Sequence, residues 1–429
     1  MTSVNHKTAS TPIAEGSPPL LAGARWTWFD DMMTVPWDQW DALPSPSAYT
    51  DPRYFRAMAG QAKVTCRIGL LKTPEGTCLG GIQMQSVLTE SRSPEEHMNV
   101  SLGVKILMKI LHPGGQPFRF RTLVAGQSLG TGEHAFRWIP NLSPAARVHF
   151  TECAFEECAR HWGSRVWMAK DFGHEQDTAI QPHWSRKWQR ATFDPLMVTP
   201  LDPAWTSQDD WMEALRTKAR TKVRSILARN ANIALERITN PEKLRTMGPE
   251  LISMYQRVYG RASIVMGGLE KGDFARLAEE WGDDFLLVTH HFEGRLVGFH
   301  CGLHHAAAGN DSPASDTAHG GTIEAYFVGF DPELNKEYAL YQRMLIEFIG
   351  WGIQNGARRV IMGRTALEIK STIGALPVSM ATWVHIRLPL AMPVIRWMIR
   401  RSPPRVFTPR RAWRAEWLDR WSEEGYRII

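Results

Sequence analysis

The sequence has 429 residues, enough for two domains of about 180 residues with sizeable cores. Hydrophobic residues make up 43% and charged residues 22%, which excludes a wholly disordered chain, and a net charge of +6 permits an anionic partner without requiring one. The five cysteines are scattered and form no CxxC pair, so we expect neither a disulfide framework nor a structural zinc site, as in a reducing cytoplasm.

The first half begins with a segment at 1–23 that is rich in Ser, Thr and Pro and has no apolar core of a signal peptide. We expect this segment to be disordered. A strand is predicted at Ala24–Met32, and Asp51 is placed to cap a short helix. Two strand-like runs, Lys63–Leu71 and Thr77–Val87, flank a Thr-Pro-Glu-Gly turn and predict a hairpin.

An alternation of strand and helix continues through residue 170. The predicted elements are a strand at Arg121–Ala125, a glycine-rich loop at Gly126–Glu133, a helix at Pro144–Trp162 and a strand at Arg165–Lys170. This order is typical of an α/β domain, which we place at 24–194. Residues 188–203 are the expected crossing into the second half.

A basic amphipathic helix is predicted at Asp209–Ile233, where apolar residues recur at steps of three and four. Arg220 and Arg224 lie on its charged face. Two interpretations stay open for that face. It is either a solvated surface or a contact to phosphates of CoA, tRNA or anionic lipid.

The most regular part of the chain follows, after a predicted helix at 241–259, a hairpin at 285–304 and a polar loop at 306–321. A strand at Thr322–Phe330, a helix at Tyr338–Asn355 with Gly356 at its end, and a strand at Arg359–Met362 form a βαβ unit. Its two strands should lie parallel, because a crossover helix joins them.

This unit resembles the GNAT superfamily of acyltransferases, and within it the branch of FemAB-type peptidyltransferases and BioF2-like acetyltransferases. The resemblance rests on two groups of residues. They are Tyr326, Gly329-Phe330-Asp331, Asn335-Lys336 and Leu340-Tyr341-Gln342 in the first, and Gly363-Arg364-Thr365-Ala366, Glu368-Ile369-Lys370-Ser371 and Gly374-Ala375 in the second. It implies a mixed α/β fold with two tandem GNAT-like domains, at 24–194 and 195–390. The first half lacks the motif residues and is interpreted as a degenerate copy.

The resemblance also implies where an activated acyl donor binds. In the superfamily the strands flanking the central helix splay apart, and the free strand edge holds the pantetheine arm of acyl-CoA. Donor contacts are therefore expected at Tyr326 and Val328, and pyrophosphate contacts at Asn335 and Lys336 near the helix N-terminus. The loop at 331–338 lacks the glycine-rich pyrophosphate sequence, as in relatives that use aminoacyl-tRNA instead of acyl-CoA.

The chemistry needs a base for the attacking amine and a donor for the oxyanion. Candidate bases are Glu324, Asp331 and Glu368, with His300 a weaker one. We expect Arg364 to bind a substrate carboxylate or the oxyanion.

Two candidates keep alternatives open. Lys370 either holds a phosphate or carboxylate, or forms a salt bridge with Glu368 or Asp331. Tyr341 either donates a proton to the leaving group or packs in the core, and Tyr326 shares both interpretations. Adjacent histidines on a strand point to opposite faces, so no metal site is predicted.

The chain ends in a basic, Trp-rich extension at 391–429, preceded by an apolar run at Leu388–Ile399 that is too short to span a bilayer. This run either packs across the domain seam or lies at a membrane surface. Trp413, Trp417 and Trp421 recur at steps of four and form one stripe.

Three functions remain at this stage. The first is N-acyl transfer from acyl-CoA, or another activated donor, to a small-molecule or peptide amine. The second is a FemAB-like transferase that uses aminoacyl-tRNA and acts on a cell-envelope precursor or small peptide. The third is a non-catalytic protein that binds anionic membranes through residues 388–429. All three fit a cytoplasmic protein, peripheral to a membrane in the third case.

Overall fold

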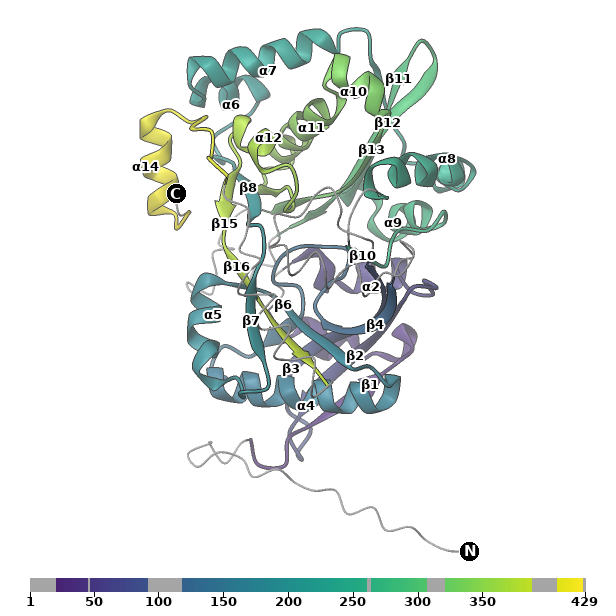
Figure 1. The fold of residues 1–429 in the computed structure, drawn as a ribbon, viewed down its shortest axis with the longest axis vertical. Helices are drawn as coiled ribbons and strands as arrows, with labels where there is room; N and C mark the ends of the chain where they lie inside the picture. Colours follow the sequence, from purple (N-terminus) through teal and green to yellow (C-terminus); the bar gives the residue numbers. More distant parts are fainter. Residues whose placement is uncertain are drawn as a thin grey trace, which may run out of the picture.

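The computed structural model describes residues 21–44, 47–91, 118–260, 264–306, 321–387 and 407–426. It contains two mixed β-sheets, one in each half of the molecule, and helices pack against both (Figure 1). Of the segment 1–23 that was expected to be disordered, residues 1–20 lie outside the described residues, whereas Leu21 is buried in the first core. The apolar run at 388–399 also lies outside the described residues. The mixed α/β class predicted from the sequence is confirmed.

The first sheet has the strand order β1-β2-β3-β4-β6-β16-β7, with short strands β5 and β10 pairing to β3. Its strands from the first half are β1 Arg25–Phe29, β2 Val64–Lys72, β3 Cys78–Ser91, β4 Phe118–Ala125, β5 Phe136–Trp138, β6 Val166–Gly173 and β7 Gln189–Thr192. The predicted hairpin is the antiparallel pair β2–β3. Strands β4 and β6 are parallel, as expected for strands on either side of a crossover helix.

The crossover helix is α4, Pro144–Trp162, and its ends match the prediction. Ser143 caps it by accepting a hydrogen bond from the N–H of Ala146, and Gly163 ends it in the left-handed conformation at φ 66°. One face of α4 packs into the first core. Shorter helices of this half are α1 Trp37–Asp41, α2 Pro52–Ala57, capped by Asp51 as predicted, and α5 His174–Ile180.

The second sheet has the order β15-β8-β14-β13-β12-β11-β9. Its strands are β8 Leu196–Pro200, β9 Ala234–Arg237, β11 Phe285–Phe292, β12 Arg295–His305, β13 Thr322–Phe330, β14 Arg359–Ile361 and β15 Leu376–Val378. Helices α8 Pro241–Tyr259, α9 Asp273–Trp281, α11 Leu340–Gln354 and α12 Leu367–Thr372 accompany them. The predicted βαβ unit is confirmed, since β13 and β14 pair in parallel around α11.

Two predicted helices differ from the structure. The helix expected at Asp209–Ile233 is two helices, α6 Gln208–Ala214 and α7 Thr217–Arg229. The break occurs at Leu215, which pairs with Trp413 of the C-terminal segment. The helix expected from Tyr338 starts at Leu340, and an unpredicted helix α10, Pro332–Tyr338, precedes it.

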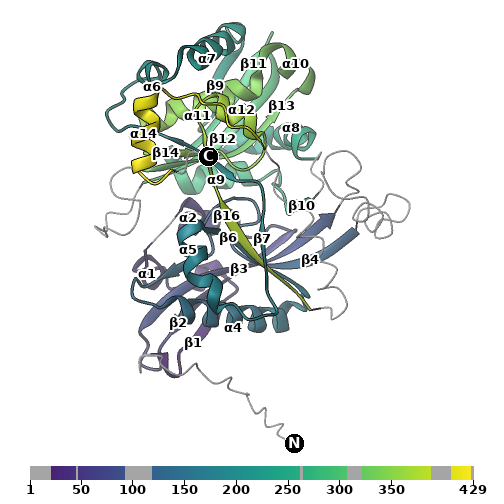
Figure 2. The same ribbon diagram turned by 60° about the vertical axis from the view of Figure 1, so that its left-hand side comes forward.

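The second half supplies two strands to the first sheet. Strand β16, Met380–Ile386, leaves the second half and lies between β6 and β7 of the first sheet, as Figures 1 and 2 show. Strand β10, Ile264–Met266, pairs with β3. The range 195–390 therefore does not form a closed second domain, because it supplies two strands that complete the first sheet. Backbone groups on the edge of β6 would otherwise lack partners.

The C-terminal segment belongs to the second half. Helix α14, Ala415–Glu423, follows Trp413, which is 1% exposed and donates its indole N–H to the carbonyl of Gly374 at 2.7 Å. Trp413 and Trp421 pack with Trp205 in the second core. No helix among the described residues is long and apolar enough to cross a membrane.

Candidate functional site

The two strands of the βαβ unit separate soon after they start. Thr322, Ile323 and Glu324 pair with Arg359–Ile361, and β13 then runs on to Phe330 without β14. Its other edge stays paired with β12, with a bulge that leaves Tyr326 without a partner residue. One edge of β13 after Glu324 therefore has no strand partner within the described residues. This is the splayed geometry that the resemblance implied.

Glu324 stands at the point where the strands part. Its side chain is buried, at 2% exposure, and its Oε1 has no hydrogen-bond partner. Burial raises the pKa of this carboxyl to about 8, although the nearby charge of Arg359 opposes the shift. A buried carboxyl with an unpaired oxygen and a pKa near neutrality suits a general base.

Lys370 is the second unpaired charged group at this end of the sheet. It lies on α12, is 2% exposed, and its Nζ is 4.0 Å from the position that a Cβ on Gly363 would occupy. Within the described residues its amine has no hydrogen bond and no ion pair, and burial lowers its pKa to about 7. The salt bridge considered with Glu368 or Asp331 is absent from the structure.

Those two carboxylates have other partners. Glu368 is exposed and pairs with Arg410 of the C-terminal segment at 3.4 Å. Asp331 caps α10 by accepting hydrogen bonds from the N–H groups of Glu333 and Leu334. Each therefore has a structural role in addition to the catalytic one predicted from the sequence.

Arg364 joins the two halves. Its Nη2 donates to Oδ1 of Asp171 at 2.7 Å, across a sequence separation of 193 residues. Asp171 is fully buried, sits in the left-handed conformation at φ 65°, and also accepts from the N–H of Gly132 at 3.2 Å. Burial acts to raise its pKa, but Lys170 and Arg364 outweigh that effect and hold it below the usual range. The buried carboxylate of Asp171 thus fixes the position of Arg364 between the two halves.

Aromatic side chains close the seam beside β13. The hydroxyl of Tyr326 is 2.7 Å from that of Tyr54 in the first half. The ring of Tyr49 lies 5.6 Å from that of Tyr326 and 4.4 Å from that of His134, between centroids. Burial raises the pKa of Tyr326 and Tyr49, so both phenols are neutral donors at ordinary pH. Tyr326 therefore lies at the interface between the halves.

The residues expected near the pyrophosphate mostly serve the turn between α10 and α11. Asn335 accepts a hydrogen bond from the N–H of Tyr341 at 2.9 Å, so one N–H of the α11 first turn is already satisfied. Lys336 is exposed and pairs with Glu333. Val328 packs against the second core, and burial raises the pKa of the Tyr341 phenol.

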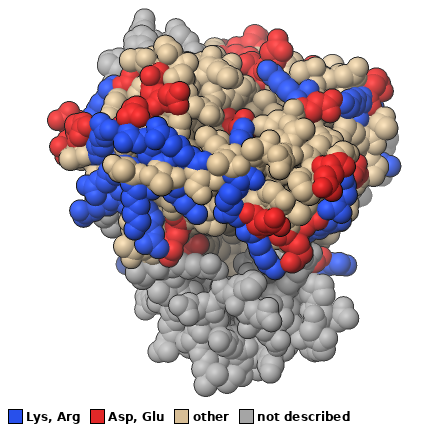
Figure 3. All heavy atoms as spheres, turned by 90° about the horizontal axis from the view of Figure 1, so that it is seen from above, with Lys and Arg blue, Asp and Glu red and all other residues tan. Residues whose placement is uncertain are grey.

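Arg220 and Arg224 lie on α7, at the end of the molecule seen in Figure 3, where Lys and Arg gather along one side. Both pair with the same carboxylate, that of Glu213 on α6, and Arg414 of the C-terminal segment joins them. A single acid is thus shared by three arginines, and a surplus of positive charge remains on this face.

The buried histidines form a cross-strand contact. Nε2 of His290 is 2.9 Å from Nδ1 of His300, and burial lowers the pKa of both rings. Both rings are fully buried and the ring of His300 packs against Phe348 of α11, so we assign them to the core. No group of three or more His, Cys, Asp or Glu side chains in the described part of the chain is arranged to hold a metal ion.

No protein-family model and no curated protein sequence matches this chain. Solved structures do. Saccharomyces cerevisiae N-myristoyltransferase, solved with bound myristoyl-CoA and inhibitors, is 10% identical over 90% of this chain and 86% of that chain, with a TM-score of 0.50. Similar too are FemX (11% identity, 83% and 96% coverage, TM-score 0.49) and a tandem GNAT protein from the clavulanic acid biosynthesis pathway (10%, 85% and 99%, 0.46).

The chain has a tandem GNAT fold. At this identity the likeness shows the fold and nothing finer. In the second half β13 and β14 pair in parallel, and in the first half β4 and β6 also pair in parallel.

In the first half a buried lysine, Lys170, lies beside the end of β4. After Ala125 the chain turns at Gly126, with φ 127°, into the glycine-rich loop. Nζ of Lys170 donates to the carbonyls of Gln127 and Gly130 in that loop, at 2.7 and 3.0 Å. The second half holds a buried amine without partners among the described residues, that of Lys370 on α12.

Sequence reasoning missed Asp171, Lys170 and Tyr49. A signal was present for the first two, since the strand Val166–Gly173 contains Lys-Asp inside an otherwise apolar run. Charges in a buried strand require partners, which here come from a distant loop. Tyr49 carried no comparable signal, because its neighbours come from three separated segments.

Proposed function

We propose that this chain transfers an acyl group from an activated donor to an amine. The observation that carries the proposal is the free edge of β13 beginning at Glu324, a buried carboxyl with an unpaired oxygen. A strand edge accommodates an extended arm such as pantetheine by backbone hydrogen bonds, with Tyr326 and Val328 on the same strand. Acyl-CoA is the donor that this geometry favours.

The amine attacks the donor carbonyl directly in the proposed reaction. Glu324 accepts the proton that the ammonium must lose, and the thiol leaves with a proton once the tetrahedral intermediate collapses. Because the pKa of the free carboxyl is about 8, most of the protein carries it protonated at pH 7. An ammonium beside it lowers that pKa and promotes the ionised form.

Lys370 and Arg364 are proposed to bind the substrate's negative groups. Lys370 offers three donors when protonated, and no acid within the described residues neutralises it. Arg364 uses Nη2 for Asp171, while its Nε is buried without a partner and is proposed to hold a substrate carboxylate or the oxyanion. Tyr341 is proposed as proton donor to the leaving group, and Asn335 and Lys336 as contacts to the donor's phosphates. Asp331 and Glu368 are retained only as weaker candidate bases.

A second donor class has its own supporting observation. The segment after β13 is helix α10, with acidic Glu333 in its first turn, where acetyl-CoA enzymes carry a glycine-rich loop. The basic face around Arg220 and Arg224 suits a polyanion. An aminoacyl-tRNA donor, with a cell-envelope precursor or small peptide as acceptor, is therefore the alternative. Either donor places the reaction in the cytoplasm.

The third function, peripheral membrane binding, loses part of its support. Trp413 and Trp421 of the C-terminal segment are buried in the second core and do not face a lipid surface. The apolar run at 388–399 lies outside the described residues. Liposome co-sedimentation with and without anionic lipid tests this function separately from catalysis.

Thermal unfolding with acetyl-CoA, longer acyl-CoAs, free CoA and bulk tRNA tests the proposal. A ligand that binds only the folded protein stabilises it by about 2.7 kcal/mol at a hundredfold excess over its Kd. A shift with a CoA species supports the leading proposal, and a shift with tRNA alone supports the alternative. Absence of any shift contradicts both.

A further inference from the structure

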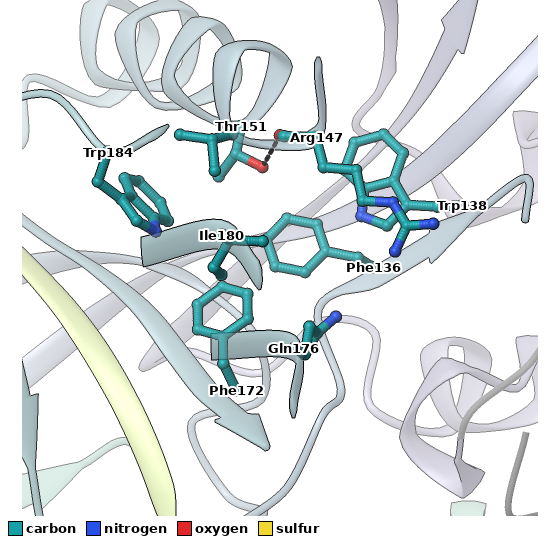
Figure 4. Close-up of a pocket in the computed structure, with 9 residues that line it drawn as sticks. Phe136, Trp138, Arg147, Thr151, Phe172, Gln176, Ile180 and Trp184 are labelled. Carbon is teal, nitrogen blue, oxygen red and sulfur yellow. Dashed lines mark hydrogen bonds between the residues drawn. The ribbon is translucent and has the colours of Figure 1, made fainter. Parts of the chain in front are cut away.

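The first half of the molecule contains a hollow between α4, α5, β5 and β6, shown in Figure 4. The ring of Phe136 stacks there on those of Trp138 and Phe172, and the hollow has room for about one water molecule. We therefore assign it no ligand. A different position, in the second half, lies beside the amine of Lys370.

The amine of Lys370 borders an open position just after β14. Gly363 lies two residues beyond the end of this strand, at φ 72°, and a Cβ on it would lie 4.0 Å from Nζ of Lys370. Apart from the chain neighbours of the glycine, no other heavy atom of the described residues lies within 4 Å of that position. A substrate atom placed there would therefore contact the amine.

The register of the strands places this position across from the free edge of β13. Ile361 is the last residue of β14 that pairs with β13, and its partner is Glu324. Gly363 follows about 7 Å further along the chain. It stays in the sheet on the other side, because its carbonyl accepts a hydrogen bond from the N–H of Met197 at 3.1 Å. An acyl donor held on the edge of β13 would thus have the amine of Lys370 on its opposite side.

This amine has the properties of a nucleophile. Lys370 is 2% exposed, and burial is the sole cause that lowers its pKa, to about 7. About half of the molecules therefore carry the neutral amine at pH 7, and a desolvated neutral lysine attacks carbonyl carbons. Lys170 is also buried, but its Nζ is occupied by the carbonyls of Gln127 and Gly130. Nζ of Lys370 has no such partner among the described residues.

We propose that Lys370 is a site of self-acylation, modified by acyl-CoA bound along β13 when no acceptor amine is present. This inference rests on the proposed donor site. Nζ attacks the thioester carbonyl, a C–N bond forms, and the C–S bond breaks as the tetrahedral intermediate collapses. The proton that the nitrogen loses passes to the sulfur. The products are an amide on Lys370 and CoA with a free thiol, and no further reactant is needed.

Acylation changes what the site can bind. The amide of an acylated lysine carries no charge, so the modified Lys370 no longer binds a negative group of the substrate. The modified protein should therefore transfer acyl groups to an external amine more slowly than the unmodified protein. Acyl-CoA without an acceptor would in this way reduce the activity of the protein.

Incubation of the full chain with acetyl-CoA, without an acceptor, tests the site by peptide mass spectrometry. We expect Lys370 to be acetylated at least about tenfold faster than the exposed Lys271, at a rate that saturates with acetyl-CoA. Free CoA should slow the reaction at Lys370 and leave that at Lys271 unchanged, because only the first needs a bound donor. Equal rates at the two lysines, or a rate at Lys370 that does not saturate, would overturn the proposal.

Intact-mass measurements on variants locate the fast acetyl group. Lys370→Met keeps an apolar chain of similar length and should lose this group. Lys370→Arg keeps the charge and should lose it as well. The matched control is Lys271→Met, which should retain it. A fast acetyl group that persists in both Lys370 variants would refute the assignment.

Thermal unfolding with acetyl-CoA separates this inference from the donor proposal. Stabilisation by acetyl-CoA without faster acetylation of Lys370 would support the donor site and contradict self-acylation. If acetyl-CoA gives no stabilisation and Lys370 reacts no faster than Lys271, the result contradicts both.

Discussion

Two buried titratable residues, Glu324 and Lys370, decide what the second half of the molecule can do. Both residues were singled out from the sequence because of their position relative to the βαβ unit. Their environment was not visible there, because burial and the absence of a partner depend on how the chain packs in three dimensions. Asp331 and Glu368 looked equally suitable as bases in the sequence, and only the structure shows that a helix cap and an arginine already use them.

Replacing Glu324 by Gln should remove the base and its titration. The transfer rate of the unmodified protein should rise with pH through about 8, since ionisation of the carboxyl generates the base. Glu324→Gln should lower the rate by about 10² to 10⁴-fold and flatten that rise. The measurement is kcat/KM against pH. Glu368→Gln serves as control and should keep the profile, and a steep profile in Glu324→Gln would exclude Glu324 as the base.

Lys370 should make the fold more stable at alkaline pH. Its pKa is about 7 when folded and 10.5 when exposed, so between these values the unfolded chain binds the extra proton. The free energy of unfolding should therefore rise from about pH 7 to 10.5. Below pH 7 the folded protein carries the full cost of burying the charged amine. Urea denaturation across this range measures it.

Lys370→Met should remove that rise, and the exposed Lys336→Met should retain it. If both variants follow the unmodified protein, the amine of Lys370 is not the cause.

At the scale of elements, sequence patterns predicted the ends of helices and strands well wherever a capping or turn residue coincided with the end of a regular spacing of apolar residues. The ends of α4 are one example, where Ser143, Pro144 and Gly163 each mark a boundary. The prediction of one continuous basic helix at 209–233 was wrong because of a tertiary contact. Its apolar stripe continues across Leu215, but a β-bridge from Leu215 to Trp413 interrupts the helix there. A bridge between residues 198 positions apart leaves no periodic signal.

Trp413→Ala tests how far the C-terminal segment supports the second half. The side chain is fully buried, and its indole packs over Gly374, where little space remains. Truncation should cost about 3 to 5 kcal/mol of unfolding free energy, measured by urea denaturation. Trp417→Ala, a partly exposed neighbour in the same stripe, should cost less. Equal costs would mean that the burial of Trp413 adds nothing.

At the scale of the whole molecule, the tandem GNAT arrangement was predictable only in outline. The order of elements indicated two copies, and the boundary near residue 195 does separate β7 from β8. The placement of β16 in the first sheet was not predictable, because β16 has the alternation of any half-buried strand and nothing in its sequence indicates which sheet it joins. Strand β16 joins the first sheet because it covers the open edge of β6. The ion pair between Arg364 and Asp171 also holds the two halves together.

The position of β16 in the first sheet predicts how the molecule unfolds. A fragment of residues 21–194 lacks β16 and β10, so the inner edges of β6 and β7 and part of β3 lose their partners. Such exposed edges favour aggregation, and the fragment should fail to give a cooperative transition in urea. The full chain should unfold in one transition reported equally by tryptophan fluorescence and far-ultraviolet circular dichroism.

A fragment extended with a linker and residues 379–387 restores β16 alone, and it should regain part of the cooperativity because both edges are paired again. If the short fragment folds cooperatively without β16, the halves are independent domains. The seam at Arg364 and Asp171 would then be a contact between two finished units, and substrate binding at that seam would leave the stability of the first half unchanged.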